Sequence, residues 1–146
     1  MIPYCESCQR PFWDMFTTSI ICAVVNECEE IALLRQDYVS TTNYVCVAGI
    51  MKLGESAEDT AIREIKEEIG LDVTSIQFIR SYPYIKKEML MLGFFATVRK
   101  EEFVLSGEVD QAEWIPVKEA LIHLREGGIA YQLVQEVIER KLYKME

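Results

Sequence analysis

The feature that most constrains this sequence is residues 49–71, where a glycine-bounded loop leads into a glutamate-rich segment. Residues 56–69 of this stretch predict a helix. Ser56 can cap its first turn, with Asp59 three residues on, and Gly70 supplies a stop signal. Three apolar positions recur at helical spacing and are predicted to face a core, namely Ile62, Ile65 and Ile69.

The same helix gathers carboxylates on one side. At about 100° per residue, Glu64, Glu67 and Glu68 lie within an arc of about 100°. Such clusters suit hard cations such as Mg²⁺, although the carboxylates alone are more typical of a solvated surface. The glycine loop favours the metal site, because it can bring backbone carbonyls close to the helix. Arg63 can hold one carboxylate in place by a two-point ion pair.

These residues match a known pattern. The Nudix box is a glycine, five residues, Glu, seven residues, and then Arg-Glu-apolar-any-Glu-Glu-any-Gly-apolar. Every fixed position of the box is present in this sequence, as Gly49, Glu55, Arg63, Glu64, Ile65, Glu67, Glu68, Gly70 and Leu71. The chain therefore resembles the Nudix family. This resemblance implies an α/β fold, an α/β/α sandwich with a mixed β-sheet, in which the box forms a loop–helix–loop.

The resemblance also implies roles for individual residues. It implies a Mg²⁺ or Mn²⁺ cofactor held by the backbone carbonyl of one residue and the carboxylates of three, Ala48, Glu64, Glu67 and Glu68. A supporting role falls to Gly49, Glu55, Arg63 and Gly70. Glu67 or Glu68 is the expected acceptor of a proton from the attacking water. Glu108 is the rival acceptor and a further candidate ligand, with a solvated loop carboxylate as the alternative interpretation.

The whole chain is most similar to the NADH pyrophosphatase branch of the family. Cys5-x-x-Cys8 before an apolar strand resembles the second half of that branch's zinc ribbon. The segment 81–89 shares only Ser81 and Pro83 with the branch's signature. Three residues are candidates for contact with the substrate, namely Ile50, Tyr82 and Tyr84, although alternation along a strand explains either tyrosine equally well.

The function implied by this resemblance is cleavage of a nucleoside diphosphate linked to another group, such as NADH, NAD, ADP-ribose or a nucleotide sugar. The products would be two monophosphates. Two alternatives stay open. One is hydrolysis of nucleoside triphosphates with release of pyrophosphate, and the other is a non-catalytic nucleotide-sensing or protein-binding module on the same scaffold.

Cysteine usage predicts reduced thiols, since five cysteines and no secretion signal are present. Cys22 and Cys46 lie in apolar runs and are predicted to be core residues. Cys5 and Cys8 supply two of the four ligands of a structural zinc site, so zinc within one chain is not expected. The pair is interpreted as a remnant without metal, a half-site shared by two chains, or a redox pair.

The sequence predicts a short cysteine-containing segment, residues 1–14, followed by one Nudix domain, residues 15–146. Two β-rich runs, 18–25 and 30–35, predict a hairpin. Four more strands are predicted at 44–48, 75–84, 88–100 and 112–117, and two further helices at 117–125 and 129–143. Mixed strands and helices suggest a sheet covered by helices.

Charge and hydropathy narrow the range of partners. The formal net charge is −9, which disfavours binding to nucleic-acid polymers but allows a small nucleotide whose charge is screened by cations. No apolar run is long enough for a membrane span, and the first residues lack a signal peptide. We therefore expect a cytoplasmic protein with no membrane partner, and the family resemblance implies a homodimer.

Overall fold

The computed structural model describes residues 2–36 and 43–144. Its centre is a six-stranded sheet in the order β6-β7-β3-β4-β8, with β5 paired to β3 outside this path. The strands are β3 (Thr17–Val25), β4 (Glu30–Arg35), β5 (Val47–Ile50), β6 (Val73–Tyr84), β7 (Met89–Val98) and β8 (Gln111–Pro116). β3 and β7 are parallel and the other pairs are antiparallel, which confirms the mixed sheet.

Strand β5 pairs with a different part of β3 from the part that pairs with β4. β4 pairs with the end of β3 through Val25 and Ile31, whereas β5 pairs with residues 19–22 of the same strand. The edge of β3 is therefore shared by two strands. This arrangement carries the chain from β5 directly into the loop before helix α1 (Ala57–Ile69), and it positions the residues of the Nudix-like box.

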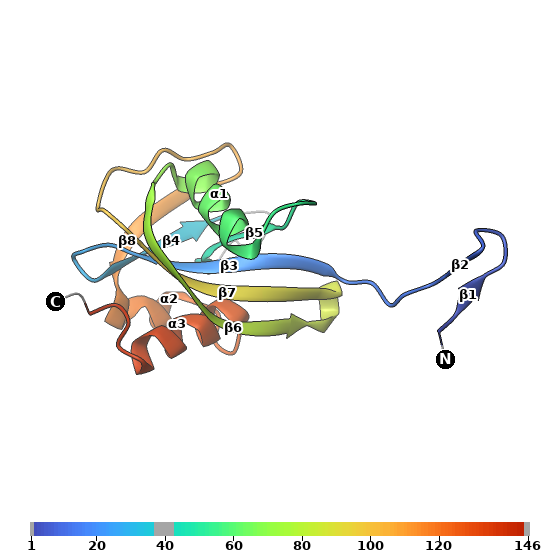
Figure 1. Cartoon of the computed structure of the whole chain (residues 1–146). Helices are drawn as coiled ribbons and strands as arrows, with labels where there is room; N and C mark the ends of the chain where they lie inside the picture. The colour runs from blue at the N-terminus through green and yellow to red at the C-terminus, as the bar shows by residue number, and fades with distance from the viewer. Residues whose placement is uncertain (1, 37–42, 145–146) are drawn as a thin grey trace.

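Helices cover both faces of the sheet, as Figure 1 shows. Helix α1 lies on one face, while the 3-10 turn η2 (Val117–Glu119), helix α2 (Ala120–His123) and helix α3 (Ile129–Glu139) lie on the other. The side chains of β3 alternate between two cores. Ile20, Cys22 and Val24 pack on the α1 side, and the next residues in turn pack on the α3 side. The predicted α/β/α sandwich is confirmed.

Helix α1 forms as its sequence predicts. The Ser56 side chain accepts a hydrogen bond from the Asp59 N–H at 3.0 Å, and Gly70 ends the helix in the left-handed conformation. Ile65 and Ile69 are fully buried. The prediction is wrong for Ile62, which is 41% exposed. The buried stripe of the helix runs through Ala61, Ile65, Glu68 and Ile69, so Ile62 lies at its edge.

Several predicted boundaries shift. The strand expected at 44–48 begins only at Val47, since Tyr44 and Val45 form isolated bridges. The helix expected at 117–125 divides into η2 and the short α2. The last helix stops at Glu139 rather than 143. Between β6 and β7, the chain forms the 3-10 helix η1 (Ile85–Lys87).

The N-terminal residues extend away from the domain in Figure 1 and end in a small hairpin of β1 (Tyr4–Cys5) and β2 (Arg10–Pro11). We retain the boundary between residues 14 and 15 as a proposal. Cys22 and Cys46 are buried, as predicted for core residues. Among residues 2–36 and 43–144, no helix has the length and hydropathy that crossing a bilayer requires.

Candidate active site

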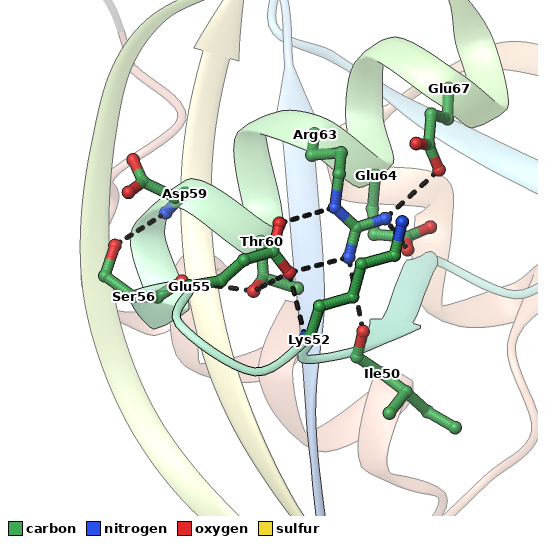
Figure 2. A network of polar contacts seen from close by, with 9 residues as sticks. All are labelled: Ile50, Lys52, Glu55, Ser56, Asp59, Thr60, Arg63, Glu64 and Glu67. Atoms are coloured by element: carbon green, nitrogen blue, oxygen red, sulfur yellow. Dashed lines mark hydrogen bonds and ion pairs between the residues drawn. The ribbon is translucent and has the colours of Figure 1, made fainter.

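Arg63 lies at the centre of the polar network drawn in Figure 2. Its Nε donates to Glu55 Oε2 at 2.6 Å and its Nη2 to Glu55 Oε1 at 2.9 Å. Its Nη1 donates to Glu64 Oε1 at 2.8 Å and to Glu67 Oε2 at 3.1 Å. Nη2 also donates to the Ile50 carbonyl at 3.3 Å. One guanidinium therefore joins β5, the following loop and helix α1.

Glu55 closes the loop before α1. Besides the pair with Arg63, its Oε1 accepts from the Lys52 N–H at 2.9 Å and from the Thr60 hydroxyl at 3.0 Å. The Arg63 guanidinium first, and these donors after it, lower the pKa of Glu55 to about 2. Glu55 is therefore ionised at neutral pH, and its carboxylate has partners on three sides. These contacts agree with the supporting role that the resemblance implies, which stays a prediction.

Gly49 and Glu64 approach each other closely. A Cβ placed on Gly49 would overlap Glu64 Cδ, so glycine leaves room for this carboxylate against β5. Burial raises the pKa of Glu64, and the neighbouring Arg63 opposes that shift. The position of the Glu64 side chain therefore explains why the box has a glycine here.

Glu68 is the most unusual carboxylate of the helix. It is 5% exposed, and its Oε2 atom has no hydrogen-bond partner among the described residues. Burial first and the nearby Glu64 second raise its pKa to about 8, while hydrogen bonds from the Ala48 N–H and the Gln36 side chain act in the opposite direction. A buried oxygen without a partner is costly, which indicates that this group has a ligand to bind.

The three predicted carboxylates do not meet at one point. No group of three or more His, Cys, Asp or Glu side chains in the described part of the chain is arranged to hold a metal ion. The reason is visible in the contacts: Arg63 stands between Glu64 and the half-exposed Glu67. The residues nevertheless fit a hard divalent cation, because Glu64 and the unpartnered oxygen of Glu68 lie together beside the backbone of β5.

The loop carrying Glu108 is fastened to the end of α1. The Val104 N–H donates to the Ile69 carbonyl at 3.0 Å, and the Ser106 N–H to the Glu68 carbonyl at 3.2 Å. Glu108 is close enough to raise the pKa values of both Glu64 and Glu68 by charge repulsion. The structure thus brings Glu108 to the carboxylate cluster, although its role in proton transfer stays a prediction.

A cavity of about 300 Å³ adjoins these carboxylates, and we call it the apolar cavity. Ala48, Gly49 and Gln36 form the wall nearest to the helix. The rest is mostly apolar, and its main side chains are Ile21, Ile50, Tyr84, Met89, Met91 and Ala130. The walls of a wider hollow of about 940 Å³ near Trp114 include none of the residues that surround Glu64 and Glu68, whereas the apolar cavity includes Gly49 next to Glu64, and Ala48 and Gln36 next to Glu68. The apolar cavity is therefore the candidate position for a substrate ring.

The two candidate tyrosines differ in position. Tyr84 lines the apolar cavity, and so does Ile50. The structure contradicts a substrate contact by Tyr82, because this side chain is 5% exposed and belongs to the core on the α3 side. Tyr82 and Tyr84 lie two residues apart and so on the same face of β6, but Tyr82 packs inside the core whereas Tyr84 ends the strand next to η1. Sequence reasoning missed that Gln36, Met89 and Met91 line the apolar cavity. The one signal in the sequence is that the two methionines alternate along β7.

The family model described as NUDIX domain matches residues 15–136, which is most of the chain. The chain belongs to the Nudix family. This membership assigns the loop after β5 and helix α1 to the Nudix box, as the sequence predicts.

Relatives by sequence point to one branch. A protein named NAD-capped RNA hydrolase NudC from Pseudomonas putida strain W619 is 35% identical over 115 residues, covering 78% of this chain and 41% of the relative. NudC of Pseudomonas putida strain F1 is 33% identical over 141 residues, covering 95% of this chain and 50% of the relative. These relatives agree with the predicted branch. The Nudix chain spans about half the length, or less, of the relatives that it matches.

Solved structures show the same fold. A NUDIX hydrolase from Nitrosomonas europaea has a TM-score of 0.79 at 16% identity, with 97% of this chain and 81% of that chain covered. The NUDIX domain of Shewanella oneidensis NrtR, solved with ADP ribose, has a TM-score of 0.75 at 13% identity, with 94% of each chain covered. At these identities, the similarity establishes the Nudix fold alone.

Proposed function

We propose that this Nudix chain hydrolyses the pyrophosphate linkage of an NAD-type dinucleotide, with Mg²⁺ or Mn²⁺, to give two monophosphates. One observation carries the proposal: the buried, unpartnered Oε2 of Glu68 lies with Glu64 at the edge of a cavity that can take a ring. A site for cations beside a site for a nucleoside is what cleavage of a dinucleotide requires.

The residues of the site have separate roles in the proposed reaction. Glu64, Glu68 and the Ala48 carbonyl would hold the divalent cation, with Glu67 joining after exchange of its contact with Arg63. When bound, the cation neutralises charge on the pyrophosphate and lowers the pKa of the attacking water. Glu67 or Glu108 accepts the proton from that water. One phosphorus–oxygen bond forms as the bridging phosphorus–oxygen bond breaks, and the second monophosphate leaves.

The substrate class has two supports. The two relatives by sequence bear a name that refers to NAD, and the NrtR domain was solved with ADP ribose, which is a nucleoside diphosphate joined to a sugar. The apolar cavity supplies apolar side chains and the Tyr84 ring for one half of such a molecule. A net charge of −9 supports a small substrate rather than a polymer held along its length.

Hydrolysis tests this proposal directly. The purified chain is incubated with Mg²⁺ and NAD, NADH, ADP-ribose, a nucleotide sugar or nucleoside triphosphates, and products are separated by chromatography. We expect two monophosphates from the dinucleotides. Release of inorganic pyrophosphate from triphosphates alone would favour the triphosphate hydrolase. Tight binding without turnover of any compound would favour the nucleotide-sensing module.

One substitution tests the observation that carries the proposal. Glu68→Gln removes the charge while keeping the size, so turnover of NAD should fall by about two orders of magnitude or more, the scale of one lost charge-stabilising group. Glu58→Gln is the matched control, since Glu58 is an exposed glutamate in the first turn of the same helix. Equal turnover in both variants would remove Glu68 from the site.

We also propose a homodimer and a cytoplasmic location. The N-terminal arm supports the dimer, because it exposes large apolar side chains away from the domain, including Phe12, Trp13 and Phe16. Light scattering of the purified protein measures its molar mass and therefore its oligomeric state.

In the N-terminal arm, Cys5 Sγ accepts a hydrogen bond from the Cys8 N–H at 3.3 Å. Metal analysis at about one zinc per two chains would support a shared half-site, and metal-free protein would leave the pair as a remnant.

A further inference from the structure

Lys52 is a cation of the candidate active site that has no role in the network around Arg63. It lies on the loop between β5 and α1, and Figure 2 shows its side chain extending toward Arg63 and Glu64 of the helix. The residue is exposed, and its ammonium forms no ion pair with any of the described residues. A lysine that points at a cluster of carboxylates without pairing to one of them is available to another anion.

The backbone of Lys52 is held in place on both sides. Its N–H donates to Glu55 Oε1 at 2.9 Å, and its carbonyl accepts a hydrogen bond from the Glu55 N–H at 3.0 Å. The same Glu55 oxygen accepts from Arg63 Nη2 at 2.9 Å. The start of the Lys52 side chain is therefore fixed beside the network, whereas the four-carbon stem can still move the ammonium to a ligand.

The donors of Arg63, by contrast, are all engaged. A guanidinium carries five N–H groups. Five hydrogen bonds from Arg63 end on Glu55, Glu64, Glu67 and the Ile50 carbonyl. Of the two cations drawn in Figure 2, Lys52 is therefore the one whose charged donors remain available to a phosphate.

The loop that carries Lys52 also joins this network to the apolar cavity. Ile50 lines that cavity, and its carbonyl accepts from Arg63 Nη2 at 3.3 Å. A substrate with its ring in the apolar cavity and its pyrophosphate at α1 would pass along this loop. We propose that the Lys52 ammonium binds a phosphate oxygen of the substrate's pyrophosphate and stabilises the negative charge that grows there during hydrolysis. This inference rests on the proposed function for the position of the pyrophosphate.

Removal of this charge should have two effects of opposite sign. Both hydrogen bonds to Glu55 come from the backbone of residue 52, so Lys52→Met removes the ammonium and keeps the loop. Without nucleotide, loss of a repelling cation should tighten binding of Mn²⁺ to the α1 carboxylates by about two- to fivefold. With Mg²⁺ present, loss of a charged donor should weaken binding of α,β-methylene-ADP, whose bridge cannot be hydrolysed, by about tenfold. Damage to the loop would weaken both.

Titration calorimetry on the purified chain measures both dissociation constants without any turnover. Lys52→Arg restores the charge and should retain most of the affinity for α,β-methylene-ADP. Lys118→Met is the matched control, because Lys118 is an exposed lysine of η2 on the other face of the sheet. Both dissociation constants should stay unchanged in this control.

Weaker nucleotide binding together with equal or tighter Mn²⁺ binding in Lys52→Met supports the inference. Three results would overturn it: unchanged nucleotide affinity in Lys52→Met, weaker binding of both ligands in that variant, or no binding of α,β-methylene-ADP to the unmodified chain. Failure of the proposed function is observed separately, as absence of NAD hydrolysis by the unmodified chain.

Discussion

Arg63 and Glu55 form a two-point ion pair, with Nε to Oε2 at 2.6 Å and Nη2 to Oε1 at 2.9 Å. The pair joins helix α1 to the loop that follows β5 (Figure 2). The same guanidinium reaches Glu64 and Glu67, so its position fixes where two further carboxylates lie. A flexible ammonium cannot reproduce this fork of donors.

Arg63→Lys is therefore expected to lower turnover of the pyrophosphate substrate by about tenfold or more, because one ammonium cannot hold Glu55, Glu64 and Glu67 together. The fold should persist, since the core side of α1 is untouched. Steady-state kinetics and circular dichroism measure the two effects. Arg80→Lys is the control, because Arg80 pairs with Glu136 on the surface of β6 and α3. Equal losses in both variants would contradict the role of Arg63.

Glu68 makes the stability of the metal-free chain depend on pH. Its pKa rises from about 4.5 to about 8 on folding, mainly through burial. Between these values the folded chain keeps a proton that the unfolded chain loses, so stability falls as pH rises from about 4.5 to 8. We expect the melting temperature in a chelator to decrease over this window. Added Mg²⁺ should reverse the decrease, because binding requires the ionised carboxylate.

The control for this pH dependence is Glu68→Gln, which cannot titrate. Its melting temperature in a chelator should change less between pH 5 and pH 8 than that of the unmodified chain, and Mg²⁺ should raise it less. Thermal melts followed by circular dichroism give both comparisons. A steep decrease that persists in Glu68→Gln would assign the effect to another group.

The sequence was sufficient for the elements that have local signals. Ser56 and Gly70 predict both ends of α1, and the box pattern predicts the sandwich around it. Glu68 shows what a local pattern omits. It shares a helix face with Glu67, yet it is buried while Glu67 is half exposed, because β5 and Gln36 pack over one of them. Burial depends on the partner strand, which helical spacing does not specify.

The same limit applies to the cavity of about 520 Å³ that Lys87 and Arg125 line. These two residues are far apart in the sequence, and no local pattern links them. Only the pairing of β6 with β7 and the packing of α3 bring them to one wall. Tyr82 and Tyr84 carry the same ambiguity, because both lie on one face of β6 and only the tertiary packing buries Tyr82 in the core while Tyr84 lines the cavity.

Gly70 is expected to be more sensitive to alanine than Gly54. Both have positive φ, 75° and 87°, so Ala at either position costs about 1 kcal/mol in backbone strain. Only at Gly70 would a Cβ meet another residue, since Val104 Cβ lies 2.6 Å away, whereas nothing lies within 4 Å at Gly54. Gly70→Ala should therefore lose a further 1–3 kcal/mol or so from overpacking. Urea unfolding of both variants measures the difference, and equal losses would contradict it.

The positions of Tyr82 and Tyr84 predict opposite results for two substitutions. The Tyr82 hydroxyl is buried without a partner among the described residues, so Tyr82→Phe should leave KM unchanged and raise stability by up to about 1 kcal/mol. Tyr84→Ala should raise KM several-fold, because this ring forms a wall of the apolar cavity. Steady-state kinetics and urea unfolding separate the two effects. A raised KM in Tyr82→Phe would show that the tyrosine hydroxyl reaches the substrate after all.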